Sequence, residues 1–96
     1  MKLLTEKNRS SLPGLYSTEN VKDPIAHVKF FDPTGSWTWY ATEFDGDDTF
    51  FGLVDGTHRE LGYFSLKELR DAPGRFGVGI ERDRHFSPCP LSGLAI

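Results

Sequence analysis

The chain has 96 residues, a length that fits one domain around one core and leaves no room for a second domain. Hydrophobic residues make up 38% of the chain and charged residues 26%, a balance that argues against intrinsic disorder. The formal net charge of −3 argues against a broad phosphate-binding surface, because proteins that bind nucleic acid cluster lysine and arginine.

The cysteine content and the lengths of the apolar runs indicate the cellular compartment in which the protein is expected. Cys89 is the only cysteine, so no intramolecular disulfide can form and nothing indicates a secreted, disulfide-bonded scaffold. The amino-terminal run MKLLTEKNRSSL has only two consecutive leucines, which is too short for the apolar part of a signal peptide. No run approaches the ~20 apolar residues of a membrane span. We therefore expect a cytoplasmic protein that does not enter a membrane.

The amino-terminal third predicts one short helix and one strand. Thr5 can cap a helix over about Glu6 to Leu12, and the following Pro-Gly pair ends it. After a polar connection, Pro24 introduces the extended run IAHVKFF, residues 25–31. The motif DPTG then predicts a turn.

The centre of the chain predicts a β-hairpin. Residues 36–44 and 49–54 are rich in β-forming side chains and flank an Asp-Gly turn signal. A two-residue turn would place Glu43 opposite Asp48, and this pair of like charges would cost stability. We therefore predict a four-residue loop, Asp45 to Asp48, which places Glu43 opposite Phe50 and Trp39 opposite Val54.

The remaining segment predicts a third neighbouring strand, a helix and a last extended run. A second Asp-Gly pair precedes a strand over Arg59 to Phe64, and Ser65 with Glu68 forms a capping-box pattern for a short helix. An extended segment follows at about 76–86. The predicted fold class is α+β: an antiparallel meander sheet of four or five strands with one or two short helices packed on one face. We expect residues 1–96 to form a single domain, with fraying at about 1–4 and 91–96.

Charge and aromatic residues are concentrated in the hairpin. No lysine or arginine occurs between Lys29 and Arg59, and six acids in that interval give it a local charge of −6. A sheet with rings on both faces and helices on one leaves an aromatic patch near the surface, unless the carboxyl-terminal tail covers the second face. Strand alternation puts both tryptophans and Glu43 on one face. We therefore predict a partner-binding surface made of Trp37, Trp39, Glu43, Asp45, Asp47 and Asp48.

Four segments of the sequence resemble a known family. The blocks WTWYATEFDGDDTFFGLVDG, ELGYFSLKEL, GIERD and LPGLYSTE are similar to the small bacterial proteins grouped as domain of unknown function 2958, which plasmids and other mobile elements commonly carry. The likeness covers nearly the whole chain, from about Leu3 to Pro90. The resemblance implies a bacterial or phage accessory protein of the cytoplasm, and it transfers no catalytic residue.

The sequence nominates no catalytic residue, metal site or cofactor. No Gly-x-Ser-x-Gly nucleophile motif and no phosphate-binding glycine loop occurs. The acids of the hairpin are the right ligands for a divalent cation, but their segment holds no lysine that would serve a metal-dependent nuclease. His85 and Cys89 alone are too few ligands for structural zinc.

The leading hypothesis is a non-catalytic binding protein of a mobile genetic element. Its acidic hairpin would attract a basic surface on a bacterial host or defence protein, and the tryptophans would anchor the contact. A first alternative is weak binding of single-stranded nucleic acid, with bases stacked on exposed rings and phosphates held by Arg75, Arg82 and Arg84. The second alternative is the metal-dependent nuclease.

Overall fold

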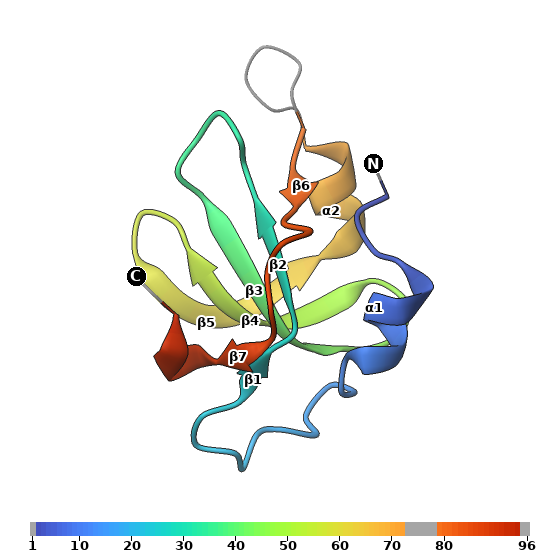
Figure 1. Ribbon diagram of the computed structural model, residues 1–96, viewed down its shortest axis with the longest axis vertical. Coiled ribbons are helices and arrows are strands. Elements are labelled where there is room, and N and C mark those ends of the chain that lie inside the picture. Colours follow the sequence, from blue (N-terminus) through green and yellow to red (C-terminus); the bar gives the residue numbers. More distant parts are fainter. Residues whose placement is uncertain (1, 73–78, 95–96) are drawn as a thin grey trace.

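The computed structural model describes residues 2–72 and 79–94 and consists of one main sheet, one short strand pair and short helices (Figure 1). The main sheet has five antiparallel strands in the order β5-β4-β3-β2-β6. Their bounds are β2 Val28–Phe31, β3 Thr38–Phe44, β4 Thr49–Asp55, β5 Arg59–Ser65 and β6 Glu81–Arg82. The predicted α+β class with an antiparallel sheet is therefore confirmed. β2 to β5 form the predicted meander, and β6 returns to the far edge beside β2.

The expected strand over residues 25–31 divides into two. β1, Ile25–Ala26, pairs with β7, Cys89–Pro90, in a separate two-stranded sheet, whereas β2 joins the main sheet. The division falls at His27, whose backbone N–H donates to the carbonyl of Ala41 at 2.9 Å. The carboxyl-terminal segment is thereby joined to the chain just before β2, and a 3-10 helix, Leu91–Gly93, follows β7.

The two α-helices begin where their capping residues predict. α1, Glu6–Ser11, is capped by Thr5, whose hydroxyl accepts from the Asn8 N–H at 3.1 Å. α2, Leu66–Asp71, is capped by Ser65, which accepts from the Glu68 N–H at 3.1 Å. In Figure 1 both helices lie to the right of the sheet.

One face of the main sheet, called the core face here, carries the hydrophobic core. Phe50 is fully buried at its centre, with ring centroids 4.4 Å from Phe44, 5.1 Å from Phe64 and 5.4 Å from Phe30. Leucines from the helices and from the chain beside them pack on these rings, namely Leu3, Leu4, Leu12, Leu66 and Leu69. Leu3 and Leu4 therefore belong to the core, although the sequence predicts fraying at 1–4.

A β-bulge in β3 changes which side chains share a face. Ala41 pairs with Gly52 and Glu43 pairs with Phe51, so Thr42 is an extra residue between them. Regular alternation would put Ala41 and Glu43 on one face, but the bulge leaves Ala41 in the core and turns Glu43 to the opposite side. Across the bulge Gly52 is required, because a Cβ there would lie 1.8 Å from the Tyr40 carbonyl oxygen.

The bulge also explains the hairpin register. The predicted pairing of Trp39 with Val54 is confirmed, but Glu43 pairs with Phe51 rather than with Phe50. The one-residue difference equals the extra residue that the bulge inserts between the two positions. The loop between β3 and β4 is nevertheless the predicted Asp45 to Asp48, although the last paired positions are Phe44 and Phe50.

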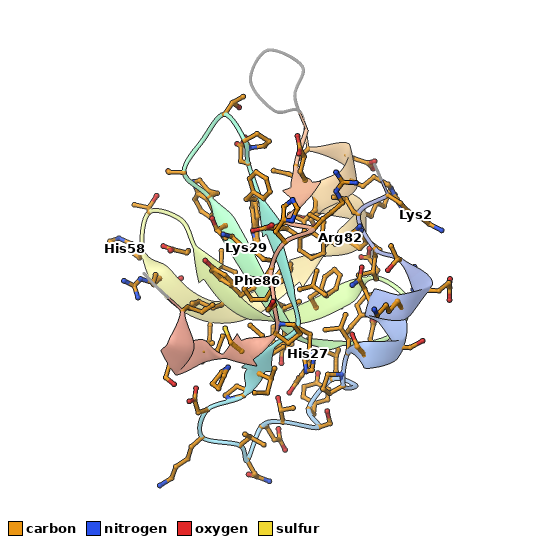
Figure 2. All side chains as sticks on the ribbon, viewed as in Figure 1. Lys2, His27, Lys29, His58, Arg82 and Phe86 are labelled. Atoms are coloured by element: carbon orange, nitrogen blue, oxygen red, sulfur yellow. The ribbon has the colours of Figure 1, made fainter. Side chains whose placement is uncertain are left out.

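The second face, called the groove face here, is covered only in part. Phe86 from the carboxyl-terminal segment packs on Tyr40, with ring centroids 5.9 Å apart (Figure 2). Beside them the Lys29 ammonium lies 3.6 Å from the Asp83 carboxylate and 5.8 Å from the Tyr40 ring centroid. The segment that holds Asp83 and Phe86 therefore covers this face over β2 and β3, although the sequence-based alternative had expected the carboxyl-terminal tail itself to cover the second face.

Candidate functional site

A loop of residues 13–24 runs over the groove face. Its first end is fixed where the Phe44 N–H donates to the Pro13 carbonyl at 2.8 Å. Its other end is fixed where the Leu91 N–H donates to the Pro24 carbonyl at 3.0 Å, and where Asp23 accepts from the hydroxyl and the N–H of Ser92. The loop thus forms a bridge whose ends are fastened to β3 and to the carboxyl-terminal segment.

Glu43 holds the middle of this bridge. One of its carboxylate oxygens accepts from the Tyr16 N–H at 2.8 Å, and the other accepts from the Thr18 N–H at 2.9 Å and from the Thr18 hydroxyl. The side chain is only 3% exposed, and among the residues that the structure describes no cation lies within 4.0 Å of its carboxylate. Glu43 is therefore a buried carboxylate satisfied by hydrogen bonds rather than by an ion pair.

Tyr16 adopts an unusual backbone conformation at this contact. Its φ is 68°, which makes it the only residue other than glycine with a positive φ among the described residues. This left-handed conformation costs roughly 1 kcal/mol or more for a residue with a Cβ. The hydrogen bond from its N–H to Glu43 helps to keep it there, and Tyr16 is 61% exposed.

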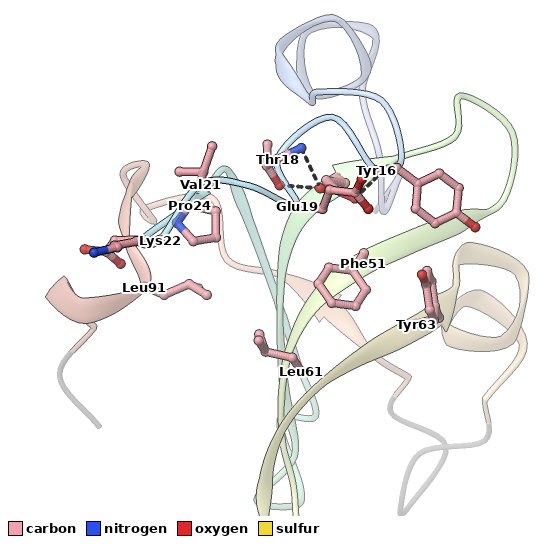
Figure 3. A pocket seen from close by; sticks show the side chains of 12 residues that line it. Tyr16, Thr18, Glu19, Val21, Lys22, Pro24, Phe51, Leu61, Tyr63 and Leu91 are labelled. Carbon is pink, nitrogen blue, oxygen red and sulfur yellow. Dashed lines mark hydrogen bonds between the residues drawn. The ribbon is translucent and has the colours of Figure 1, made fainter.

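The loop and the sheet enclose a groove of about 350 Å³, called the loop groove here (Figure 3). β3, β4 and β5 provide its floor through Glu43, Phe51, Leu61 and Tyr63. The loop provides a wall through Tyr16, Thr18, Glu19, Val21, Lys22, Asp23 and Pro24, and Leu91 closes one end. Its volume is at the lower end of the roughly 300–1,000 Å³ typical of ligand sites.

Exposed apolar side chains concentrate around the loop groove. Six large hydrophobic residues are exposed in the described part of the chain, and four of them line it: Tyr16, Val21, Leu61 and Tyr63. Each of these four is at least half exposed. Tyr63 packs against Phe51, with ring centroids 5.0 Å apart in an edge-to-face arrangement. Apolar surface that is gathered in one place marks a binding site more often than scattered apolar residues do.

The polar groups of the loop groove are mostly acidic. Three carboxylates line it, from Glu19, Asp23 and Glu43, against the single ammonium of Lys22. Lys22 lies at the Leu91 end, away from Tyr16 and Tyr63 (Figure 3). The pKa of the Tyr63 phenol is raised by desolvation and then by a hydrogen bond with Tyr16, so this phenol is neutral at pH 7. The tyrosine end of the groove therefore carries negative charge from carboxylates only.

The predicted hairpin acids have separate structural roles. Asp45 accepts from the N–H groups of Asp47, Asp48 and Thr49 at 2.8–3.1 Å, which shapes the hairpin loop. Asp48 accepts from the Ser65 hydroxyl at 2.7 Å and from the Lys67 N–H at 2.8 Å, which fastens the start of α2. Asp47 is exposed. In the part of the chain that the structure describes, no group of three or more His, Cys, Asp or Glu side chains is placed to hold a metal ion.

The structure does not bring the predicted tryptophans to these acids. Trp37 and Trp39 are close to each other, with ring centroids 6.1 Å apart, but they lie at the opposite end of β3 from the acidic loop. A seven-residue strand spans roughly 20 Å. Trp39 packs against the core, and Trp37 is 43% exposed and lies over Gly56. The predicted surface is therefore divided between two ends of one hairpin.

Two of the three predicted anion-binding arginines, Arg82 and Arg84, lie apart from the loop groove. Arg82 donates to the Lys2 carbonyl and lines a smaller hollow of about 210 Å³ together with Arg84 and His27. Arg75 lies outside the described residues. Burial lowers the pKa of His27, so this imidazole adds no positive charge at neutral pH. Nucleic-acid binding by these arginines stays a prediction.

Sequence reasoning missed most of the loop groove. Tyr16, Phe51, Leu61 and Tyr63 are not among the predicted site residues, although Leu61 and Tyr63 alternate in a predicted strand and therefore share a face. The pairing of Phe51 with Tyr63 follows from the hairpin register, so these three were within reach of the sequence. Nothing in LPGLYSTE reveals that Tyr16 takes a left-handed conformation over the sheet.

Comparisons with known proteins agree with the resemblance described above. No curated protein and no solved structure matches the chain. No helix of the described residues is long and apolar enough to cross a membrane. A family model described as "Protein of unknown function (DUF2958)" matches residues 3–95. The chain therefore belongs to the family of unknown function DUF2958.

Proposed function

We propose that this protein is a non-catalytic binding protein that engages a partner protein through the loop groove. The observation that carries the proposal is the concentration of exposed apolar side chains, Tyr16, Val21, Leu61 and Tyr63, around one hollow. At protein interfaces a few residues near the centre of the contact supply most of the binding free energy, and tyrosine is enriched among them. The groove thus takes the anchoring role that the sequence had suggested for the tryptophans.

The charge of the groove indicates the kind of partner. Three carboxylates against one ammonium favour a basic surface, which agrees with the basic partner predicted from the acidic hairpin. That the partner is a host or defence protein, and that the chain serves a mobile element, remain predictions from the family resemblance.

A library of displayed peptides tests the proposal without knowledge of the partner. Peptides selected on the folded protein are measured by titration calorimetry against Leu61→Asp and against Trp37→Ser. Both residues are exposed, at 58% and 43%, so neither change removes a buried contact from the core. We expect Leu61→Asp to weaken binding at least tenfold, because a charge enters the apolar centre of the contact.

The Trp37→Ser variant is the matched control. If the loop groove is the binding surface, this variant binds the selected peptides as the unchanged protein does. Loss of binding by Trp37→Ser with full binding by Leu61→Asp would move the site to the tryptophan end of β3 and overturn the proposal. Selection of no peptide at all would also count against a protein-binding role.

A further inference from the structure

We propose that the tyrosine end of the loop groove recognises one cationic side chain of the partner, a lysine or an arginine. The site consists of the rings of Tyr16, Phe51 and Tyr63 and the carboxylate of Glu43. The inference rests on the proposed function, because it states which side chain enters the groove. It is carried by two independent features, the arrangement of the rings and the buried carboxylate without a cation.

The rings form a corner rather than a flat stack. Phe51 and Tyr63 meet at 62° with centroids 5.0 Å apart, so their planes form two walls at an angle to each other. Tyr16 from the loop lies across from them at the same end (Figure 3). An ammonium or guanidinium group is attracted to ring faces within about 6 Å, and several rings around one position strengthen this attraction.

The carboxylate supplies the charge that the rings alone lack. Two carboxylate oxygens offer about four acceptor positions. Donors of the loop occupy three acceptor positions of Glu43, one on Oε1 and two on Oε2. One acceptor position on Oε1 is left. Glu43 lines the groove while 97% of it is buried, and no cation within the described residues pairs with it. A buried charge without a counter-ion is unfavourable, so a cation that enters the groove gains more here than at an exposed carboxylate.

The Glu43 carboxylate also fixes the position of Tyr16 on the loop. Tyr16 takes its positive φ of 68° where its N–H donates to Glu43 at 2.8 Å. Strained backbone of this kind is found at ligand-binding positions, where the surrounding structure enforces it. Because Glu43 both fixes Tyr16 and carries the charge, the rings and the carboxylate are in place before a ligand arrives, which lowers the cost of binding.

Single amino-acid derivatives provide the test, because they do not depend on the partner. The probes are the N-acetyl, N′-methylamide derivatives of lysine, arginine and norleucine, added in the millimolar range to the full chain. Norleucine has the length of lysine without the charge. We expect the lysine and arginine derivatives to shift the amide NMR signals of Tyr16, Thr18 and Tyr63, and to bind about tenfold more tightly than norleucine.

Two substitutions at Tyr63 distinguish the effect of the aromatic ring from the effect of apolar side-chain volume. Tyr63→Phe keeps a ring and should keep the preference for a cation, whereas Tyr63→Leu should lower the affinity for the lysine derivative severalfold. Glu43→Gln should remove most of the difference between lysine and norleucine. Because Glu43→Gln can also loosen the loop, the Tyr63 pair is the decisive measurement.

The possible outcomes are distinct from those of the peptide experiment. Equal or tighter binding of norleucine, or shifts confined to the hollow at Arg82, would overturn the inference. If peptides bind in a manner that depends on Leu61 while no cationic derivative is preferred, the groove binds a partner by apolar contact and only the cation site fails. If no peptide binds but the lysine derivative is preferred, the cation site stands and the proposed protein-binding role fails.

Discussion

The acids at the tip of the β3–β4 hairpin, Asp45 and Asp48, lie close in sequence to Glu43 near the end of β3, but they have a different structural role. Asp45 and Asp48 are exposed or half-buried and accept hydrogen bonds from the hairpin loop and from the start of α2 beside it. Glu43 is buried and accepts from a loop 25 and 27 residues away. The tip acids complete the fold locally, whereas Glu43 builds a surface feature between distant segments.

This difference teaches what decides the role of a carboxylate. Each of these three side chains accepts backbone N–H groups that belong to no strand or helix ladder. At the tip the donors are neighbours, so the carboxylate shapes a turn. At Glu43 the donors come from across the molecule, because the bulge turned the side chain away from the core. Acidic residues that are close together in the sequence therefore need not form one binding surface.

The largest expected effect that separates the two regions comes from Glu43→Ala. Two partly buried hydrogen bonds, donated by the N–H groups of Tyr16 and Thr18, lose their acceptor. We expect the free energy of unfolding to fall by about 3 kcal/mol in urea denaturation, the sum of two unsatisfied groups. The amide NMR signals of Tyr16 and Thr18 should also move toward random-coil positions. A loss below about 0.5 kcal/mol, typical of surface substitutions, would place Glu43 with the exposed acids.

The next effect is expected at Asp48. Asp48→Ala removes the acceptor of the Lys67 N–H and of the Ser65 hydroxyl, so the first turn of α2 should lose stability. We expect a lower melting temperature than that of the unchanged protein, but a higher one than that of Glu43→Ala. Asp48→Asn is the control, since its amide oxygen still accepts one bond. If the melting temperature of Asp48→Ala is at or below that of Glu43→Ala, the acids at the hairpin tip contribute as much to stability as Glu43 in the strand, and the proposed difference between them is wrong.

Acid pH should act mainly through the exposed acids. Backbone hydrogen bonds, first from Asp47, lower the pKa of Asp45, and the Ser65 hydroxyl followed by the Lys67 N–H lowers that of Asp48. A carboxyl whose folded pKa is depressed stabilises the fold above its unfolded pKa, near 3.9, and this contribution is lost as the pH falls through the folded pKa. Urea midpoints measured from pH 6 downward should therefore begin to lose the contribution of these groups near pH 4.

The double variant Asp45→Asn with Asp48→Asn checks the source of this pH dependence. Its unfolding free energy should change less with pH below about 4 than that of the unchanged protein, because both titrating groups are gone. Asp23, whose pKa the Ser92 hydroxyl lowers, titrates in both proteins and cancels in the comparison. Identical pH dependence of the two proteins would show that other carboxyls govern acid unfolding.

The smallest effect is expected from divalent cations and from Asp47. Asp45 and Asp48 already bind backbone donors, so the hairpin tip should gain nothing from magnesium or manganese beyond general screening by salt. Melting temperatures in millimolar magnesium, manganese and sodium chloride of equal ionic strength should agree.

Asp47→Asn should change the free energy of unfolding by less than about 0.5 kcal/mol. Specific stabilisation by magnesium that Asp47→Asn abolishes would support the nuclease alternative.

The fold was largely readable from the sequence because local chemistry marks its boundaries. Thr5 and Ser65 cap both helices, and the two Asp-Gly pairs separate β3, β4 and β5. The bulge could not be read, because Thr42 is an ordinary strand residue and only the packing of the two faces selects it. The pair of β1 with β7 involves two residues on each side, too few for a periodic signal.

The candidate site was less predictable than the fold. Alternation in the sequence predicted Glu43 on the same face as Trp39, but Trp39 packs on the core and the bulge turns Glu43 to the other face. Tyr16 and Val21 lie in an irregular loop, where neither period nor capping residues indicate which side chains face the sheet. A site assembled from a loop and a bulged strand depends on contacts between distant residues, and such contacts leave no pattern in a single sequence.

The long sequence separation between Glu43 and its hydrogen-bond donors also implies an order of folding steps. Glu43 faces the loop only after β3 and β4 have paired with their bulge, and hairpins form in microseconds. The loop must then close onto a residue 27 positions away, so the groove is completed after the sheet that carries it. In the reverse direction the loop can detach while the sheet stays paired. The amide hydrogens of Tyr16 and Thr18 should therefore exchange with solvent much sooner than that of Phe50.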